Sequence, residues 1–186
     1  MLKYCLYILF LITCLACQQG QQNIEPSNDL SIQKIDYDTR LKNLNIKLPI
    51  IKSPIANYKH ITQSGKTLYL AGKGPKDDSG KYIKGKLGAD MTVDEGYAAA
   101  RAAGIQQLAV LKNHLGDLNK VKQVLKVQGM VNASSSFENH PEVINGFSDL
   151  MVEVFGDRGK HARAAIGMAS LPRNICVEID MIVEVY

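Results

Sequence analysis

The sequence has no tryptophan, few aromatic residues and little cysteine. Aromatic side chains make up 6% of the 186 residues, and there are four cysteines. A cysteine content this low excludes a disulfide-dense miniprotein, and no cysteine spacing suggests zinc or thioredoxin chemistry. The sequence also has no collagen-like glycine repeat and no sustained heptad pattern, which excludes a fibrous protein or a long coiled coil. A single modest globular domain is the class that remains.

A large excess of one charge is also missing. Lysine and arginine together number 22 against 18 acidic residues, which gives a formal net charge of +4. This mild basicity does not by itself argue for a nucleic-acid partner, and we expect none. Hydrophobic residues make up 46% of the chain, which excludes disorder over its whole length.

Long hydrophobic runs are absent outside residues 1–17. That segment has one lysine and an apolar stretch of about a dozen residues, shorter than the ~20 residues that a membrane-spanning helix needs. The stretch ends at Cys17, and residues 18–30 are rich in Gln, Asn and Ser. This arrangement is typical of a bacterial lipoprotein signal followed by a polar tether. We therefore expect a lipid on Cys17, a place in the cell envelope, and contact with the membrane only through that anchor.

Two alternatives stay open for this segment. Cys14 is a second candidate for the lipidated residue, because an apolar Leu-Ile-Thr sequence precedes it. An ordinary cleaved signal peptide or an uncleaved anchor would show a similar basic start and apolar run.

Residues 31–186 are predicted to form one α+β domain. A short helix is expected from Ser31, and prolines at positions 49 and 54 prevent its continuation. Strands are predicted where apolar residues are bounded by glycine or alternate with polar residues, over residues 66–72, 121–131, 162–171 and 175–186.

Two longer helices are predicted between these strands. The first begins at Thr92, which forms a Thr-x-x-Glu capping box with Glu95, and it ends at Gly116. Residues at helical spacing are expected on its apolar face: Tyr97, Ala100, Gly104, Ile105, Leu108, Leu111 and Leu115. The second follows Pro141, over residues 143–155. The order β(β)αβαββ predicts two helices packed on one face of a sheet.

Isolated residues with reactive side chains receive structural interpretations. Cys176 lies in an apolar strand and is expected to be a small core residue. The four histidines have no partners at metal-ligand spacing, so we expect no metal. His161 is interpreted first as a solvated loop residue, with a second anion contact as the alternative.

Three separated segments of the domain form a recognisable set: residues 54–75, residues 119–145 and residues 161–180. The third is the most specific, with Arg163 near its start, a Leu-Pro turn and Glu178 in the following strand. From about residue 48 to the end, the chain resembles the RidA/YjgF family of enamine and imine deaminases, formerly labelled endoribonuclease L-PSP. It looks like a less studied branch of that family.

The resemblance implies a chorismate-mutase-like fold that assembles as a homotrimer, with pockets between the subunits. It also implies hydrolysis of 2-imino acids and related enamines to 2-oxo acids and ammonia. No metal or organic cofactor is expected, because a protonated imine is already electrophilic. The partner is then a small carboxylate such as an imino acid.

The roles of individual residues follow from the same resemblance. Arg163 would bind the substrate carboxylate through two parallel hydrogen bonds. Glu178 would position or activate the attacking water and handle the proton. The substrate-binding positions that the resemblance adds are Tyr58, Gly72, Lys73, Asn145 and Ala165.

The sequence departs from the family pattern at three positions in or next to the predicted site. The turn serine of the family is replaced by Ala71, the cysteine after the arginine by Ala165, and the turn glutamine by Lys73. The lost hydroxyl and thiol keep an alternative open, in which the chain is a non-catalytic module that binds small carboxylates at the cell envelope. RNA binding or endoribonuclease activity is less favoured because the charge is modest and no histidine pair is evident.

Overall fold

The structure, a computed structural model, describes residues 35–186. The predicted signal with Cys17, the tether at residues 18–30 and the expected helix start at Ser31 lie outside the described residues. Within them, the first helix is α1 (Tyr37–Asn43), whose Asp36 side chain caps the free N–H groups of its first turn. None of the helices in this part of the chain is both long enough and apolar enough to cross a bilayer.

The alternating apolar residues build a five-stranded sheet with the order β1-β2-β5-β3-β4. Its strands are β1 (Ile61–Ser64), β2 (Thr67–Lys73), β3 (Val121–Asn132), β4 (Ala162–Met168) and β5 (Val177–Val185). Neighbouring strands are antiparallel, except that β3 and β4 run parallel. β1 lies outside the strand ranges predicted from the sequence, and it pairs with β2 across a tight turn at Gly65.

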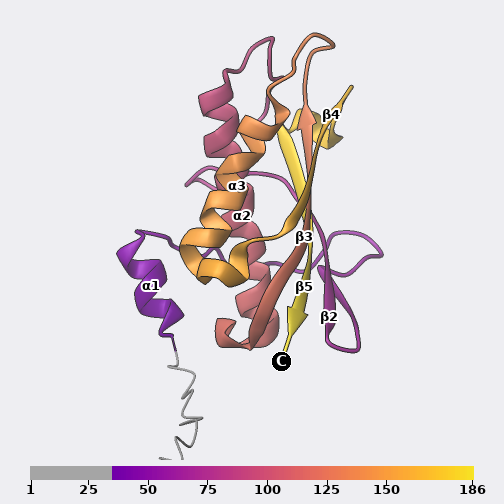
Figure 1. The fold of residues 1–186 in the computed structure, drawn as a ribbon. Coiled ribbons are helices and arrows are strands. Elements are labelled where there is room, and N and C mark those ends of the chain that lie inside the picture. The colour runs from indigo at the N-terminus through magenta and orange to yellow at the C-terminus, as the bar shows by residue number, and fades with distance from the viewer. Residues whose placement is uncertain (1–34) are drawn as a thin grey trace, which may run out of the picture. The chain divides into compact units, whose positions relative to one another are not determined.

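Two long helices, α2 (Val93–Leu115) and α3 (His140–Phe155), lie side by side on one face of the sheet (Figure 1). The α+β architecture expected from the sequence, with two helices packed on one face of a sheet, is therefore confirmed. The capping box is also present, since Oε2 of Glu95 accepts from the backbone N–H of Thr92 at 2.8 Å. Short 3₁₀ turns complete the order: η1 (Leu118–Lys120), η2 (Gly156–Gly159) and η3 (Pro172–Asn174).

The apolar face of α2 differs in part from the prediction. Tyr97 is only partly buried, and its hydroxyl donates to Oδ2 of Asp149 at 2.8 Å. Small residues fill the contact instead, because α2 and α3 approach closely. A Cβ atom on Gly146 would lie 2.0 Å from the backbone oxygen of Tyr97, and one on Gly104 would lie 2.7 Å from Cδ2 of Leu150.

The ends of two strands also differ from the prediction. β4 ends at Met168 and β5 begins at Val177, because the segment between them turns through η3. Arg173 and Asn174 both have positive φ there, which is incompatible with an extended strand. Cys176 is fully buried next to β5, as expected of a core residue.

The two faces of the sheet differ in what covers them. In β5 the buried Val177 and Ile179 flank Glu178, which is partly exposed. Gly129 of β3 pairs with Ile179, and a Cβ atom on Gly129 would lie 2.5 Å from Cδ1 of Ile144 in α3. The buried set therefore faces the helices, and Glu178 faces away from them because successive strand residues point to opposite sides.

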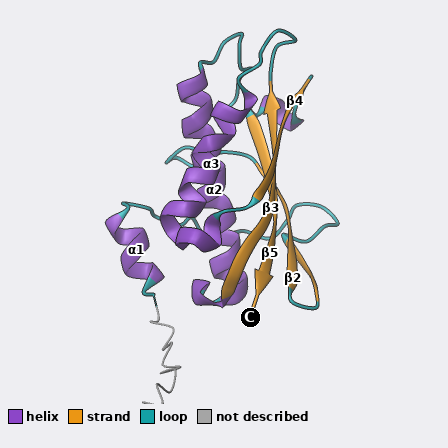
Figure 2. Cartoon of the chain, in the orientation of Figure 1, coloured by secondary structure: helices purple, strands orange, loops and turns teal. Residues whose placement is uncertain are grey.

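We call the side that α2 and α3 leave uncovered the open face (Figure 2). The strand registers place these residues on it: Tyr69, Lys126, Gln128, Met130, Ile166, Glu178, Asp180 and Ile182. Apolar and charged side chains thus share a surface that neither long helix covers.

Candidate functional site

Arg163 is held in place by the helix that covers its strand. It pairs with the buried Val127 of β3, and its side chain extends toward α3. Nη1 donates to Oδ1 of Asn145 at 2.8 Å and to Oγ of Ser148 at 3.1 Å. The structure thus brings together Arg163 and Asn145, two of the residues predicted for the site.

His161 extends this group of hydrogen bonds. Its Nδ1 lies 2.6 Å from the carbonyl oxygen of Gly159, which can only accept, so Nδ1 carries the proton. Nε2 is then an acceptor, and the Ser148 hydroxyl donates to it at 3.1 Å. Burial lowers the pKa of His161, and the charge of Arg163 lowers it further. His161 is therefore not the solvated loop residue expected from the sequence.

We call Asn145, Ser148, His161 and Arg163 the Arg163 cluster. Ala165 lies two residues further along β4, pairs with Gly129 and packs against the core, so it faces the same side as Arg163. Ser148 was not predicted as a site residue. A serine in the middle of a helix gives no sequence signal, and its role follows only from the strand that packs beside it.

A second group forms around Glu178. A Cβ atom on Gly72 would lie 2.4 Å from Oε1 of Glu178, so the absence of a side chain at Gly72 makes room for the carboxylate. Lys73 follows in the chain, and its Nζ donates to Nδ1 of His60 at 3.0 Å. Tyr58 packs edge-on against His60, with the ring centroids 6.2 Å apart. We call Tyr58, His60, Gly72, Lys73 and Glu178 the Glu178 cluster.

Burial shifts the two charged groups of this cluster toward their neutral forms. The pKa of Glu178 is raised mainly by burial and further by Asp180, while Lys73 opposes the shift. The pKa of Lys73 is lowered mainly by burial, and the Glu178 charge opposes that change. Such a pair of groups, pushed toward neutrality in a partly exposed position, is typical of sites that move protons.

A buried amide fixes the backbone of this cluster. The register between β2 and β5 shifts between Leu70 and Lys73. At this irregularity, Nε2 of Gln107 in α2 donates to the carbonyl oxygens of Ala71 at 3.1 Å and Ile179 at 2.7 Å. The side chain of Gln107 thereby holds the strand segment that puts Gly72 beside Glu178.

Within one copy of the chain Arg163 and Glu178 lie on opposite faces of the sheet. Arg163 faces the helices, whereas Glu178 lies on the open face. The registers also separate them by the width of β3 and by three residues along the strands, which is about 10 Å in each direction. One copy of the chain cannot bring both residues to one small substrate.

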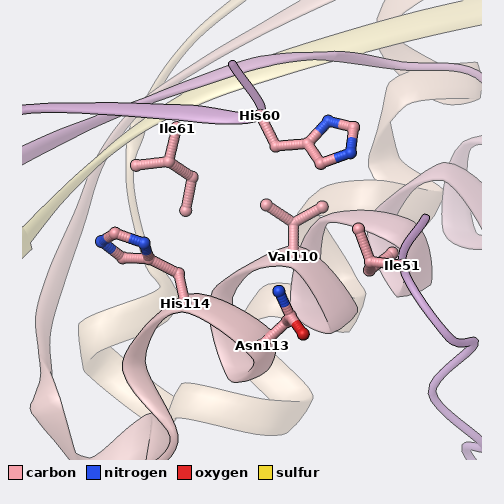
Figure 3. A pocket seen from close by; sticks show the side chains of 6 residues that line it. All are labelled: Ile51, His60, Ile61, Val110, Asn113 and His114. Atoms are coloured by element: carbon pink, nitrogen blue, oxygen red, sulfur yellow. The ribbon is translucent and has the colours of Figure 1, made fainter. Parts of the chain in front are cut away.

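A separate small hollow lies between α2, β1 and the segment that precedes β1 (Figure 3). Its volume is about 180 Å³, and its lining is Ile51, His60, Ile61, Val110, Asn113 and His114. Figure 3 shows His60 and His114 on different sides of the hollow, so the fold brings two histidines nearer than the sequence suggested. Over residues 35–186, no group of three or more His, Cys, Asp or Glu side chains could hold a metal ion.

Comparison with known proteins agrees with the architecture. Residues 38–185 match a family described as "YjgF/chorismate mutase-like, putative endoribonuclease". Protein TCP17 of Trypanosoma cruzi is 46% identical over 145 residues, which cover 77% of this chain and 91% of that protein.

Solved structures show the same relationship. Protein Atu1372 of Agrobacterium tumefaciens, described as having unknown function, is 43% identical with a TM-score of 0.74, over 81% of this chain and 94% of that one. A Shewanella oneidensis protein described as "a putative endoribonuclease" is 34% identical with a TM-score of 0.77. The match covers 80% of this chain and 99% of that one. RidA from an Antarctic Psychrobacter is 22% identical with a TM-score of 0.50, and the match covers 72% of this chain and 92% of that one. At this identity the similarity supports the fold alone. This chain belongs to the YjgF/chorismate mutase-like family.

Proposed function

We propose that this protein hydrolyses small, reactive 2-imino acids, and the enamines that tautomerise to them, to 2-oxo acids and ammonia. The balanced reaction is R–C(=NH)–COO⁻ + H₂O → R–CO–COO⁻ + NH₃. One observation carries the proposal: a guanidinium held by neighbouring side chains and a half-buried carboxyl group of raised pKa occur in one chain. The first can bind a carboxylate, and the second can exchange protons with water and with nitrogen.

Arg163 is arranged to receive the substrate carboxylate. Both of its hydrogen bonds within residues 35–186 use Nη1, which leaves Nη2 and Nε to donate side by side. A guanidinium whose rotamer is already fixed loses little further freedom when it binds an anion. Asn145 and Ser148 are therefore positioning residues for Arg163.

Glu178 would act on water. Because its pKa is raised, the carboxyl group of Glu178 stays protonated up to a higher pH than that of an ordinary glutamate. The ionised form accepts a proton from the attacking water, and the protonated form returns it to the departing nitrogen. The backbone N–H groups at Gly72 and Ala165 would add donors to the substrate, and Lys73 would add positive charge.

The separation of Arg163 from Glu178 requires that several copies of the chain assemble. Because Arg163 and Glu178 lie on opposite faces, a complete site needs the Arg163 cluster of one copy and the Glu178 cluster of another. The open face offers apolar side chains for such contact, with Tyr69 47% exposed and Ile166 41% exposed. We assign the assembly as a homotrimer with a pocket between each pair of subunits, in line with the family resemblance.

The test is an assay on imines made in place. An amino-acid oxidase generates 2-imino acids, semicarbazide traps them, and the loss of trapped product measures hydrolysis. The wild type should lower the semicarbazone yield, while Arg163→Ala and Glu178→Ala should each lose about a hundredfold or more in kcat/KM, since each removes a charged group that acts on the substrate. Arg173→Ala and Glu184→Ala are the matched controls, and both should retain wild-type rates.

Mixing the two inactive variants tests the shared site. After joint unfolding and refolding, mixed assemblies would contain some pockets with both Arg163 and Glu178 intact. Activity should return to a fraction of the wild-type value. If the mixture stays inactive although mixed assemblies form, the proposal of a site between subunits is wrong.

A second candidate function is capture of small carboxylates without turnover. Ala71 and Ala165, which lack the hydroxyl and thiol of the family pattern, favour it. Calorimetric binding of a 2-oxo acid that depends on Arg163, in a protein that hydrolyses no imine, would support this alternative.

RNA cleavage is the third candidate, and it draws on the names of the relatives. His60 lines the hollow together with His114, but both nitrogens of His60 already have partners, in Lys73 and in the carbonyl oxygen of Lys52. The hollow of about 180 Å³ is also smaller than the ~300–1,000 Å³ typical of ligand pockets. Incubation with a labelled RNA is the direct check.

The proposal extends to location. A lipid on Cys17 would hold the protein at the cell envelope, with residues 18–30 as the tether. Labelling with a palmitate analogue in cells should be lost in Cys17→Ala and kept in Cys14→Ala. The reverse result would assign the lipid to Cys14.

A further inference from the structure

We propose that Lys73 is a nucleophilic amine that forms a covalent imine with the substrate carbon during turnover. This inference rests on the proposed function and deepens it, because it assigns a chemical step to a residue treated so far as a binding group. The substrate class is a carbonyl or imine compound that carries a carboxylate.

The geometry around Lys73 is that of a nucleophile, a base and a group that orients the base. Nε2 of His60 lies 2.8 Å from the carbonyl oxygen of Lys52. A carbonyl can only accept, so Nε2 carries the imidazole proton and Nδ1 presents a lone pair. That lone pair lies 3.0 Å from Nζ of Lys73. His60 is therefore placed to take a proton from the ammonium group.

The surroundings of Nζ favour the loss of that proton. Over residues 35–186, no carboxylate lies within 4.0 Å of Nζ, and its other contact is the carbonyl oxygen of Gly72 at 3.5 Å. Burial lowers the pKa of this lysine, which supports the assignment made from the contacts. Lysines in such partly desolvated positions are the ones that form imines with carbonyl substrates in enzymes.

The chemistry balances without any added reagent. The neutral amine of Lys73 attacks C2 of the protonated substrate imine, and His60 carries a proton from Nζ to the substrate nitrogen. The bond from C2 to that nitrogen breaks, ammonia leaves, and C2 is now doubly bonded to Nζ. Water positioned by Glu178 then adds to C2, the bond from C2 to Nζ breaks, and the 2-oxo acid departs as Lys73 regains its protons.

The covalent step also gives a reason for the side chains at this site. Gly72, the residue before Lys73, makes room for the Glu178 carboxylate, and the Glu178 charge acts on the pKa of Lys73. A lysine that only attracted anions would need neither an imidazole lone pair nor an oriented tautomer beside its Nζ.

The test traps the intermediate with the full-length protein. Pyruvate serves as the probe because it would form the same imine in the reverse direction, and sodium cyanoborohydride reduces an imine to a stable amine. Peptide mass spectrometry then locates the adduct. We expect Lys73 to be modified at least tenfold faster than Lys76, which lies three residues further along the chain and packs over Tyr82. Equal modification of the two lysines would overturn the proposal.

Two variants separate a nucleophile from a positive charge. Lys73→Arg keeps the charge and should lose both the adduct and at least 90% of the turnover, whereas Lys76→Arg should retain both. His60→Phe should slow adduct formation near neutral pH and recover at higher pH, where hydroxide replaces the missing base. Full turnover in Lys73→Arg would also overturn the proposal. An adduct at Lys73 in a protein that hydrolyses no imine would refute the deaminase function and leave the nucleophile in place.

Discussion

A Cβ atom on Gly72 would lie 2.4 Å from Oε1 of Glu178 and 2.9 Å from its Cγ, so the two residues share one small space. The carboxylate occupies its present position only because residue 72 has no side chain. The contact joins β2 to β5 at the point where their register shifts.

Gly72→Ala should displace Glu178 and lower the free energy of unfolding by about 1–3 kcal/mol, the usual cost of overpacking. In a Glu178→Ala background the same substitution should cost at least about 0.5 kcal/mol less, because the clash is gone. Urea unfolding of the wild type, the two single variants and the double variant measures this coupling. An equal cost in both backgrounds would show that Glu178 does not limit residue 72.

The open face should govern assembly. Ile166 is 41% exposed on this face, and Val152 is 38% exposed on α3. Ile166→Lys would bury a charge in the proposed contact between copies and should weaken assembly about tenfold or more, since such a charge costs well above the ~1.4 kcal/mol of one factor of ten. Sedimentation velocity over a dilution series is the measurement. Val152→Lys is the matched control, and equal sensitivity of the two variants would place the contact elsewhere.

The Arg163 cluster should make stability depend on pH in the acid range. The pKa of His161 in the folded state lies below its ordinary value of 6.5. The unfolded chain therefore binds the proton first as the pH falls, so folded stability is lost from about pH 6.5 downward. His161→Gln should remove this component of the pH dependence, as measured by thermal unfolding across the range.

A direct measurement follows from the same cluster. Removing the guanidinium by Arg163→Ala should raise the pKa of His161, because the charge that opposes protonation is gone. Nuclear magnetic resonance titration of the imidazole reports this shift. An unchanged pKa would show that the two side chains do not interact.

Cys176 should be chemically inert in the folded protein. It is fully buried, and burial raises the pKa of its thiol to about 11. Only the thiolate reacts with alkylating reagents, so iodoacetamide near pH 8 should label Cys176 slowly until the protein is unfolded in guanidinium chloride. Peptide mass spectrometry distinguishes this residue from the other cysteines, and fast labelling without denaturant would contradict the burial.

Local patterns predicted the elements but not all of the faces. The alternation in β5 places Glu178 opposite Val177 and Ile179, and this can be predicted from the sequence alone. The same reasoning fails for Arg163, because the small residues of β4 alternate in no clear way between apolar and polar. Its direction is set by the parallel pairing with β3 and by Asn145 and Ser148 on α3.

The contacts of Lys73 show the second limit. Lys73 and His60 are 13 residues apart, and their meeting depends on the irregular register at the end of β2. A lysine in a glycine turn predicts an exposed charge, whereas burial and an imidazole partner come from the tertiary fold. The role of Gln107 was not predicted for a similar reason. The helix was recognised from apolar residues at helical spacing, and a polar residue among them carries no signal in that pattern.

Gln107 has a consequence for the order in which the protein becomes active. Its two hydrogen bonds join α2 to Ala71 and to Ile179, at sequence separations of 36 and 72 residues. Ile179 belongs to β5, which is the last of the five described strands in chain order. Gly72 and Lys73 come long before it, but their partner Glu178 and the amide that fixes their backbone act only after β5 has joined the sheet. We therefore expect chains truncated before β5 to bind no substrate, so that the site becomes functional in a single step, when β5 joins the sheet.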